Sequence, residues 1–272
     1  MVLTPLQTID YSLIEMKIDT ITRFLSKKRV VIAFSGGVDS TLVAYFASKY
    51  AKDSLLVMQT GLSVGIGEAE VARQVANDLG LPLRFIEYNE FELDTNYAKN
   101  PENRCYYCKS LLHHFLEDIR RNENYDVVIN GTNATDILGH RPGYLAIQEF
   151  QAQSPLLNAG LSKLEVRYLA HNYGLRVWDK PATACLASRF QTGVPITANA
   201  LKTIAIVEDK LKSQFNLKQI RLRFHGEEYH LEIDSDELLL LDSTMQHVIL
   251  NYIKTLGLDI LPKIRKYHSR ER

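Results

Sequence analysis

The sequence predicts an α/β fold in which a parallel sheet is followed by a small carboxyl-terminal α+β domain. Three observations support this prediction. Short apolar runs alternate with helical patterns in the first half of the chain, and glycine-containing polar segments directly follow two of these runs. After about residue 195 the pattern changes to a strict alternation of apolar and polar residues, which is typical of antiparallel strands.

Strands and helices alternate through the first half of the chain. The run 30–34 is apolar throughout, as expected of a strand that is buried on both faces. Such alternation places helices on both faces of a parallel sheet, and ligands then bind at the carboxyl ends of the strands. The elements expected here are helices over 12–27, 41–49, 68–79 and 107–121, and strands over 30–34, 55–58, 83–86 and 127–129.

The carboxyl-terminal part has a different pattern. Residues 220–224 and 229–233 alternate as half-buried strands, and the residues between them are expected to form a hairpin turn. A helix over 197–211, for which Thr197 is a plausible cap, precedes them, and a helix over 244–256 follows. We therefore expect two domains, 1–195 and 196–272.

Composition and charge exclude several classes of protein. The 272 residues carry 32 Lys and Arg and 32 Asp and Glu, so a nucleic-acid partner is not expected. No apolar run reaches the roughly 18 residues of a membrane span, and the amino terminus lacks the apolar core of a signal peptide. We therefore expect a cytoplasmic protein that does not enter a membrane.

The segment 35–40, Ser-Gly-Gly-Val-Asp-Ser, lies between the strand 30–34 and the next helix. Its glycines allow a sharp turn of the backbone, in which N–H groups can point toward a bound anion. The dipole of the following helix also attracts an anion to this position. Asp39 could hold Mg²⁺ beside a phosphate. The alternative is a plain strand-to-helix turn. The candidate ATP-binding residues are Ser35, Gly36, Gly37, Asp39 and Ser40, with Thr41 as a further hydroxyl donor.

The three cysteines cannot all pair within one chain. Cys105 and Cys108 are three residues apart, a spacing that suits one helical face or a tight turn around a metal, and Cys185 lies far along the chain. Three thiolates without a fourth ligand suit a [4Fe–4S] cluster with one open iron. Half a zinc site, a redox pair and buried thiols are the alternatives.

Further polar residues are candidates for binding phosphates or a nucleotide. Arg221 and Arg223 alternate on one strand and so share a face, which suits a 5′-phosphate; a pair of surface arginines is the alternative. Arg189, beside Cys185, either holds substrate or phosphate or pairs with an acid. At the end of the strand 127–129 the candidates for contact with ATP are Gly131, Thr132, Asp136 and Arg141.

Several segments together resemble the LarE family of PP-loop ATP pyrophosphatases. The first of them, Ser35 to Ser40, has the PP-loop pattern, and the others follow in family order. The resemblance implies an adenine nucleotide alpha hydrolase-like fold. The matching segments are 33–42, 130–133, Asp136 with 141–143, 154–156, 178–181, Cys185 with 188–189, and 221–225.

This resemblance implies an AMP- and pyrophosphate-forming sulfurtransferase. Family members use ATP to adenylate the carboxylates of pyridinium-3,5-biscarboxylic acid mononucleotide and replace oxygen by sulfur, in the biosynthesis of the nickel-pincer nucleotide of lactate racemase. Members with a single cysteine sacrifice the sulfur of the residue that matches Cys185, whereas members with three bind a [4Fe–4S] cluster. The resemblance also implies a sulfide donor, a homo-oligomer, catalytic roles for Asp39, Cys105, Cys108 and Cys185, and an acidic residue near the substrate at Glu208.

Three other functions remain open from the sequence. A PP-loop tRNA thiolase also uses cysteines, but it should need a basic RNA-binding face. An amidating synthetase that uses ammonia should need no cysteine. A regulatory nucleotide-binding module should bind ATP without releasing pyrophosphate.

Overall fold

The computed structural model describes residues 10–139, 141–258 and 261–267. The chain divides into two compact units. The second unit takes in two short segments from the first half of the chain in addition to its carboxyl-terminal part. The first unit comprises residues 1–60, 67–88 and 103–183, and the second comprises residues 61–66, 89–102 and 184–272. A domain boundary at residue 195, as expected from the sequence, stays a proposal.

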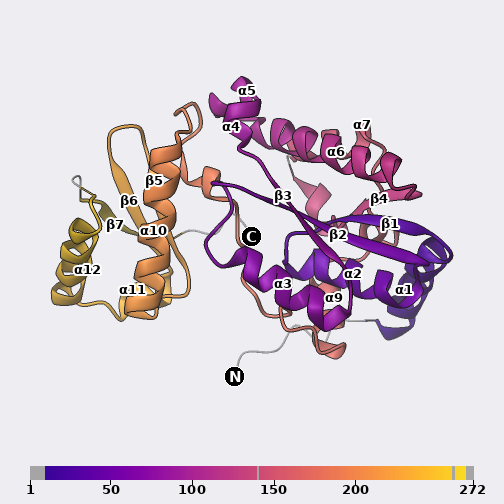
Figure 1. Ribbon diagram of the computed structural model, residues 1–272. Helices are drawn as coiled ribbons and strands as arrows, with labels where there is room; N and C mark the ends of the chain where they lie inside the picture. The colour runs from indigo at the N-terminus through magenta and orange to yellow at the C-terminus, as the bar shows by residue number, and fades with distance from the viewer. Residues whose placement is uncertain (1–9, 140, 259–260, 268–272) are drawn as a thin grey trace. The chain divides into compact units, whose positions relative to one another are not determined.

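A four-stranded parallel sheet forms the centre of the first unit (Figure 1). Its strands are β1 (Arg29–Ala33), β2 (Asp53–Thr60), β3 (Leu83–Glu87) and β4 (Val127–Asn130), in the order β3-β2-β1-β4. Val31 of the central strand β1 pairs with Leu55 on one side and Val128 on the other. The predicted parallel α/β class is therefore confirmed.

Helices cover both faces of this sheet, as Figure 1 shows. On one face α6 packs Leu112 and Leu116 against Val31, Val57 and Val128 in a buried apolar cluster. Some of the helices begin at a residue whose side chain accepts the first amide groups; Ser162 and Glu165, for example, form a capping box at the start of α9. The helices are α1 (Tyr11–Leu25), α2 (Val38–Tyr50), α3 (Glu68–Leu79), α6 (Arg104–Asn122), the 3₁₀ helix η2 (Ala134–Leu138), α7 (Pro142–Glu149), α8 (Pro155–Asn158) and α9 (Lys163–Asn172).

The second unit contains a three-stranded sheet in the order β5-β6-β7. β5 (Ile220–Phe224) and β6 (Tyr229–Ile233) form the expected antiparallel hairpin, and β7 (Lys263–Lys266) pairs with β6 in parallel. The Thr197 hydroxyl accepts the Ala200 amide at the start of α10, as predicted. The helices are α4 (Glu90–Leu93), α5 (Thr95–Ala98), the 3₁₀ helix η3 (Leu186–Arg189), α10 (Ala198–Phe215), α11 (Ser235–Leu239) and α12 (Ser243–Thr255).

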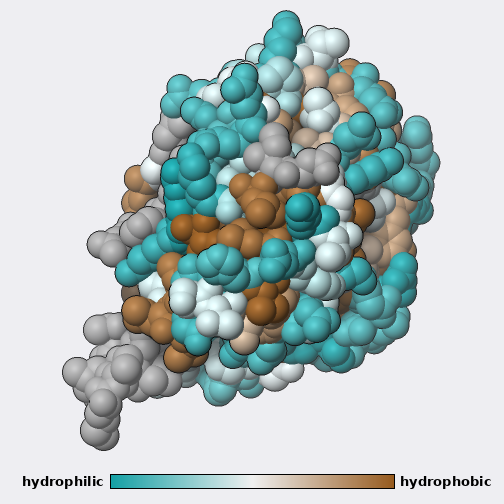
Figure 2. Space-filling model, turned by 90° about the vertical axis from the view of Figure 1, so that its left-hand side faces the viewer, coloured by the Kyte–Doolittle hydropathy of each residue, from teal (hydrophilic) through white to brown (hydrophobic). Residues whose placement is uncertain are grey.

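The surface of the second unit carries exposed apolar side chains. Leu239 at the end of α11 and the following Leu240 are more than four-fifths exposed, and Met245 of α12 is also exposed. Hydrophobic residues gather on the face that Figure 2 shows.

Within the part of the chain that the structure describes, no helix combines the length and the apolar character that a bilayer crossing requires.

The backbone of Gly131, directly after β4, lies against the first turn of α2. A Cβ atom at Gly131 would lie 2.6 Å from the Ser40 amide nitrogen and 2.8 Å from the Asp39 carbonyl carbon. Both of these atoms are backbone, so neither can rotate away. Only glycine therefore allows the ends of β1 and β4 to approach this closely.

We expect Gly131→Ala to shift the Asp39–Ser40 turn and to destabilise the protein by about 1–3 kcal/mol, the usual cost of overpacking a tight contact. Thermal and urea unfolding measure this change. Gly139→Ala is the matched control, because an added Cβ there meets no described atom within 4 Å. Equal free energies of unfolding for Gly131→Ala and Gly139→Ala would show that an added Cβ at Gly131 does not overpack the contact with α2.

Candidate functional site

The segment 35–40, called the glycine loop below, is stabilised by its own hydroxyl groups. The Ser35 and Ser40 Oγ atoms lie 3.1 Å apart, the Gly37 amide donates to Ser35 Oγ at 3.3 Å, and Ser40 Oγ donates to the Gly37 carbonyl at 3.1 Å. Gly36 has a left-handed φ of 67° and packs against Ala72 of α3. Helix α2 begins within this segment, at Val38, and no side chain caps it, so its first amide groups can bind an anion.

Asp39 joins the glycine loop to the end of β4. Its Oδ1 accepts a hydrogen bond from Asn133 Nδ2 at 3.0 Å, and its Oδ2 forms an ion pair with Lys163 Nζ. Asn133 is itself held, because its Oδ1 accepts the amides of Thr135 and Asp136 in the first turn of η2. The carboxylate is thus fixed at the sheet edge where parallel α/β folds bind their ligands.

A cleft of about 560 Å³, open solvent included, adjoins the glycine loop. Three basic residues line it: Lys163 and Arg167 of α9, and Lys180. Lys180 Nζ pairs with Glu68 at 2.7 Å and lies 3.4 Å from the Gly36 carbonyl oxygen. Arg167 donates to the carbonyl oxygens of Trp178 and Lys180 and so holds this segment in place. The cleft combines open helix amides, cations and a carboxylate, which is a suitable set for a magnesium–polyphosphate ligand.

Sequence reasoning missed the three basic residues of the cleft. A P-loop carries its lysine directly after the glycines, whereas here the lysines come from segments more than a hundred residues away. Two signals were present. The pattern Ser-Lys-Leu-Glu over 162–165 predicts a helix start at Lys163, and Lys180 lies in the segment 178–181 that the resemblance includes.

The other residues predicted to contact ATP lie near the loop but do not line this cleft within the described structure. Gly131 touches the first turn of α2, and the Thr132 amide donates to Asn130 Oδ1 at 2.9 Å. Arg141 and Asp136 form an ion pair with each other at 2.8 Å. Their roles in binding ATP stay predictions.

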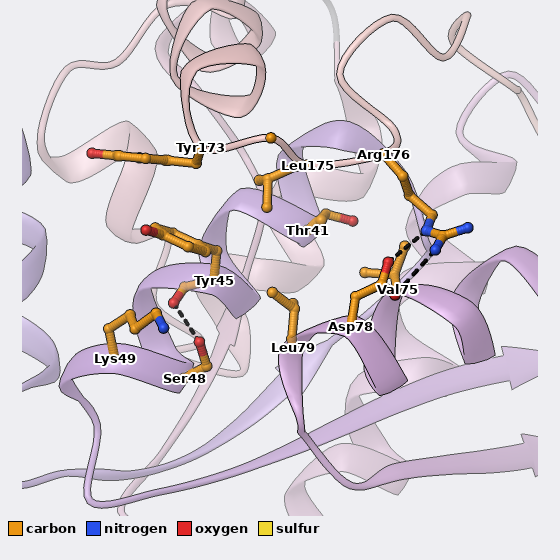
Figure 3. A pocket seen from close by; sticks show the side chains of 11 residues that line it. Thr41, Tyr45, Ser48, Lys49, Val75, Asp78, Leu79, Tyr173, Leu175 and Arg176 are labelled. Carbon is orange, nitrogen blue, oxygen red and sulfur yellow. Dashed lines mark hydrogen bonds and ion pairs between the residues drawn. The ribbon is translucent and has the colours of Figure 1, made fainter.

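Thr41 turns toward a second cleft, formed by α2, α3 and the segment after α9 (Figure 3). Its Oγ1 is buried and has no hydrogen-bond partner among the described atoms. Tyr45 and Tyr173 stack at 4.5 Å on one side of this cleft, and Arg176 pairs with Asp78 on another. Thr41 thus lines this second cleft and does not line the cleft beside the glycine loop.

The three cysteines belong to different units. Cys105 and Cys108 lie one turn apart at the start of α6 in the first unit, where Cys105 is exposed and Cys108 is half-buried. Gly143 of α7 packs on this turn: an added Cβ would lie 3.3 Å from the Cys105 carbonyl oxygen. Cys185 precedes η3 in the second unit and is exposed. Among the described residues, no group of three or more His, Cys, Asp or Glu side chains is arranged to hold a metal ion.

Three arginines of the second unit differ in their partners. Arg189 and Glu208 are buried and form a bidentate ion pair with both contacts at 2.9 Å, while Arg223 pairs with Glu232 at 2.9 Å. Arg221 has no carboxylate partner within the described residues; it lies over the Tyr267 ring at 4.4 Å. Burial, and next the nearby charge of Arg189, lowers the pKa of Arg221, so a bound anion would relieve an unfavourable charge.

Comparison with known proteins decides the family. A family model described as asparagine synthase matches residues 19–239, which include the glycine loop and both arginines of β5. The chain belongs to the PP-loop ATP pyrophosphatase family. The glycine loop is therefore its PP-loop, and the protein is of a class that uses ATP.

Three relatives illustrate the range of this PP-loop family. An uncharacterized protein of Synechocystis sp. is 36% identical over 228 residues, covering 83% of this chain and 84% of that protein. Pyridinium-3,5-bisthiocarboxylic acid mononucleotide synthase of Lactiplantibacillus plantarum is 30% identical over 208 residues, covering 76% and 75%. One of the subunits of the glutamine-hydrolyzing GMP synthase of Methanococcus maripaludis is 29% identical over 176 residues, covering 60% and 55%.

We expect Lys163→Met to weaken the binding of Mg-ATP to the PP-loop cleft by about tenfold, which corresponds to roughly 1.4 kcal/mol. The substitution removes a cation from the cleft and leaves Asp39 without its ion pair. Calorimetric titration with Mg-ATP measures the effect, and Lys52→Met, at an exposed position outside the cleft, serves as the control. Affinity equal to that of the unchanged protein would show that Lys163 does not contribute.

We expect the buried His113 of α6 to make the stability of the first unit depend on pH. The side chain is 1% exposed, stacks on Phe150 at 5.7 Å, and its Nδ1 has no partner among the described atoms. Burial, and next the charge of Lys109, lowers the pKa of His113 from 6.5 to about 4. Between these two values the unfolded chain binds a proton that the folded chain does not, so stability falls as the pH falls.

We expect this histidine to remove roughly 3 kcal/mol of unfolding free energy as the pH drops from about 6.5 to below 4. Urea unfolding across this range measures the loss. His113→Phe should flatten the pH dependence of the unfolding free energy, whereas His247→Gln, at an exposed site, should leave it as in the unchanged protein. Parallel pH profiles for the unchanged protein and His113→Phe would refute the assignment.

Proposed function

We propose that the protein is an ATP-dependent sulfurtransferase that acts on pyridinium-3,5-biscarboxylic acid mononucleotide. The observation that carries this proposal is in the second unit. The exposed Cys185 stands in a turn that is bonded to Arg189 and Arg223, and Arg221, on the same strand as Arg223, has no acid partner among the described residues. A thiol thus lies within one unit that also offers an uncompensated cation for a substrate phosphate. The Lactiplantibacillus relative is named as a synthase of the corresponding bisthiocarboxylic acid mononucleotide, which supports the same reaction.

The PP-loop cleft supports activation of a carboxylate. The α2 amides, Lys163 and Lys180 would hold the ATP phosphates, and Asp39 would hold Mg²⁺ beside them. A substrate carboxylate oxygen then attacks the α-phosphorus, the bond to the β-phosphate breaks, and pyrophosphate leaves. The resulting acyl-adenylate has AMP as a good leaving group, which the free carboxylate lacks.

The cysteines support transfer of sulfur to this acyl-adenylate. Hydrosulfide attacks the acyl carbon, AMP leaves with the C–O bonding electrons, and a thiocarboxylate remains. The donor set fits a [4Fe–4S] cluster in kind, because thiolates are its usual ligands and both Cys105 and Cys185 are solvent-accessible. Cys105, Cys108 and Cys185 would hold the cluster, and when bound it would supply sulfide from an external donor at its open iron.

The remaining predictions are part of the same proposal. Arg221 and Arg223 would bind the 5′-phosphate of the mononucleotide. The product would serve nickel-pincer nucleotide biosynthesis and so lactate racemase maturation. A cytoplasmic location and a homo-oligomer remain part of the same proposal.

Amide formation with ammonia is the second candidate, because one relative bears the name of a GMP synthase. Both reactions begin with an adenylate at the PP-loop. They differ in the nucleophile, so only the sulfurtransferase should depend on cysteine.

We expect anaerobically purified protein to contain about four iron and four acid-labile sulfide per chain, and Cys105→Ser or Cys108→Ser to lose both, because a cluster needs each of its thiolates. With the mononucleotide, Mg-ATP and sulfide, the unchanged protein should form the thiocarboxylate repeatedly, as mass spectrometry of the product would show.

The cysteine variants separate the candidate functions. Cys185→Ser should lose thiocarboxylate formation but still release pyrophosphate in the presence of the mononucleotide. Thiocarboxylate formation by Cys185→Ser would refute the role of this residue. Amide formed with ammonia at an equal rate by the variant without cysteines would favour the synthetase.

A further inference from the structure

The turn that carries Cys185 is too short to hold its own shape. Only four residues, Leu186–Arg189, follow Cys185 in 3₁₀ conformation, and such a helix makes few and weak internal hydrogen bonds. The thiol is exposed, so packing around the side chain does not fix it either. The position of Cys185 therefore depends on contacts that other parts of the second unit make with the turn.

Arg189 supplies the most extensive of these contacts. Its Nη1 donates to the Ala184 carbonyl oxygen at 2.9 Å and to Ser188 Oγ at 3.1 Å, so one guanidinium nitrogen bridges the residues on either side of Cys185. Its Nε and Nη2 face the opposite way and bind both carboxylate oxygens of Glu208 on α10. Glu208 Oε1 also accepts the Leu222 amide of β5 at 2.8 Å.

This chain of bonds connects the cysteine turn to a helix and a strand. Arg189 and Glu208 are 3% and 4% exposed, so water does not compete for their hydrogen bonds. A buried ion pair often gives no more stability than an apolar pair of the same volume, because both charges lose their hydration. Its distinctive contribution here is directional: the planar guanidinium fixes the turn relative to Glu208.

Two further attachments hold the same turn. The Leu186 amide donates to the Ser63 carbonyl oxygen at 2.8 Å, and the Ser63 hydroxyl bonds to the buried carboxylate of Glu90. Arg223 Nη1 donates to the Ser188 carbonyl oxygen at 2.8 Å. Arg189 is the member that reaches the residues on both sides of Cys185.

We infer that the Arg189–Glu208 ion pair positions Cys185 for sulfur transfer. The inference rests on the proposed function for the role of Cys185. It differs from direct contact with the substrate, which the sequence offers as one alternative for Arg189 and which the resemblance suggests for Glu208. Arg189 and Glu208 are positioning residues: they act on the reaction through the backbone of the cysteine turn. Their loss should therefore reduce kcat for sulfur transfer rather than raise KM for the mononucleotide.

Two variants test the inference. The double variant Arg189→Met/Glu208→Leu replaces the pair by apolar side chains of similar volume, which buried sites often tolerate. Arg189→Lys keeps the charge opposite Glu208 but loses the planar fork that reaches Ala184 and Ser188. Arg176→Lys is the control, because Arg176 forms a bidentate pair with Asp78 that is exposed and lies in the first unit.

We expect both test variants to lower kcat for thiocarboxylate formation by about tenfold to a hundredfold, the effect of a displaced reacting group. KM for the mononucleotide should stay within about twofold. Hydrogen exchange of the peptide 184–190 should become at least about tenfold faster in both, while the peptides of α10 keep their protection. The peptide of β5 should keep its protection in Arg189→Lys, which retains Glu208 as the acceptor of the Leu222 amide. Arg176→Lys should match the unchanged protein in each measurement.

Each other outcome overturns the inference. An unchanged exchange rate of 184–190 would show that the pair does not hold the turn, and faster exchange with unchanged kcat would show that the held position is not used. A raised KM with unchanged kcat would instead assign Arg189 to the substrate phosphate. If the double variant does not fold, Arg189→Lys decides alone. Sulfur transfer by Cys185→Ser would refute the role that the proposed function gives to Cys185, whereas the exchange rates would still report on the turn.

Discussion

The contact between the Gly131 backbone and the first turn of α2 is the constraint on which the PP-loop site depends. Because no side chain separates them, the ends of β1 and β4 lie close enough for Asn133 to reach Asp39. The same closeness lets α9, which follows β4 in the chain, place Lys163 on the other oxygen of that carboxylate. One missing Cβ atom thus allows an acid, an amide and a cation from three segments to meet at one edge of the sheet.

Elements with a strong local signal could be predicted from the sequence. The four parallel strands, the helices between them and the hairpin of β5 and β6 have apolar periods that match their structure. The short helices α4 and α5 and the strand β7 could not, because four-residue elements are stabilised mainly by the contacts around them. Helix α9 is an intermediate case, since its capping box was visible but its apolar period is weak.

In the candidate site, too, the residues with a local sequence signal were predictable and those that depend on long-range contacts were not. The residues of the PP-loop were predictable because six consecutive positions match one local structure. Lys163 and Lys180 were not, because their role depends on a long-range approach that no spacing along the chain encodes. The pairing of Arg189 with Glu208 is similar: the sequence offered an acid partner as one of two alternatives, and the geometry of the second unit shows that partner.

The second unit is built from segments that lie far apart in the chain, and this affects how it folds during translation. Its segments 61–66 and 89–102 are synthesised early, but their partners, such as Gln191 and Val194 for the Asn100 side chain, leave the ribosome about a hundred residues later. These early segments cannot make those contacts until then, whereas the strands of the first unit's sheet are complete once residue 130 has been synthesised. The cysteine turn, which bonds to Ser63, is consequently among the last parts of the molecule to acquire its structure during translation.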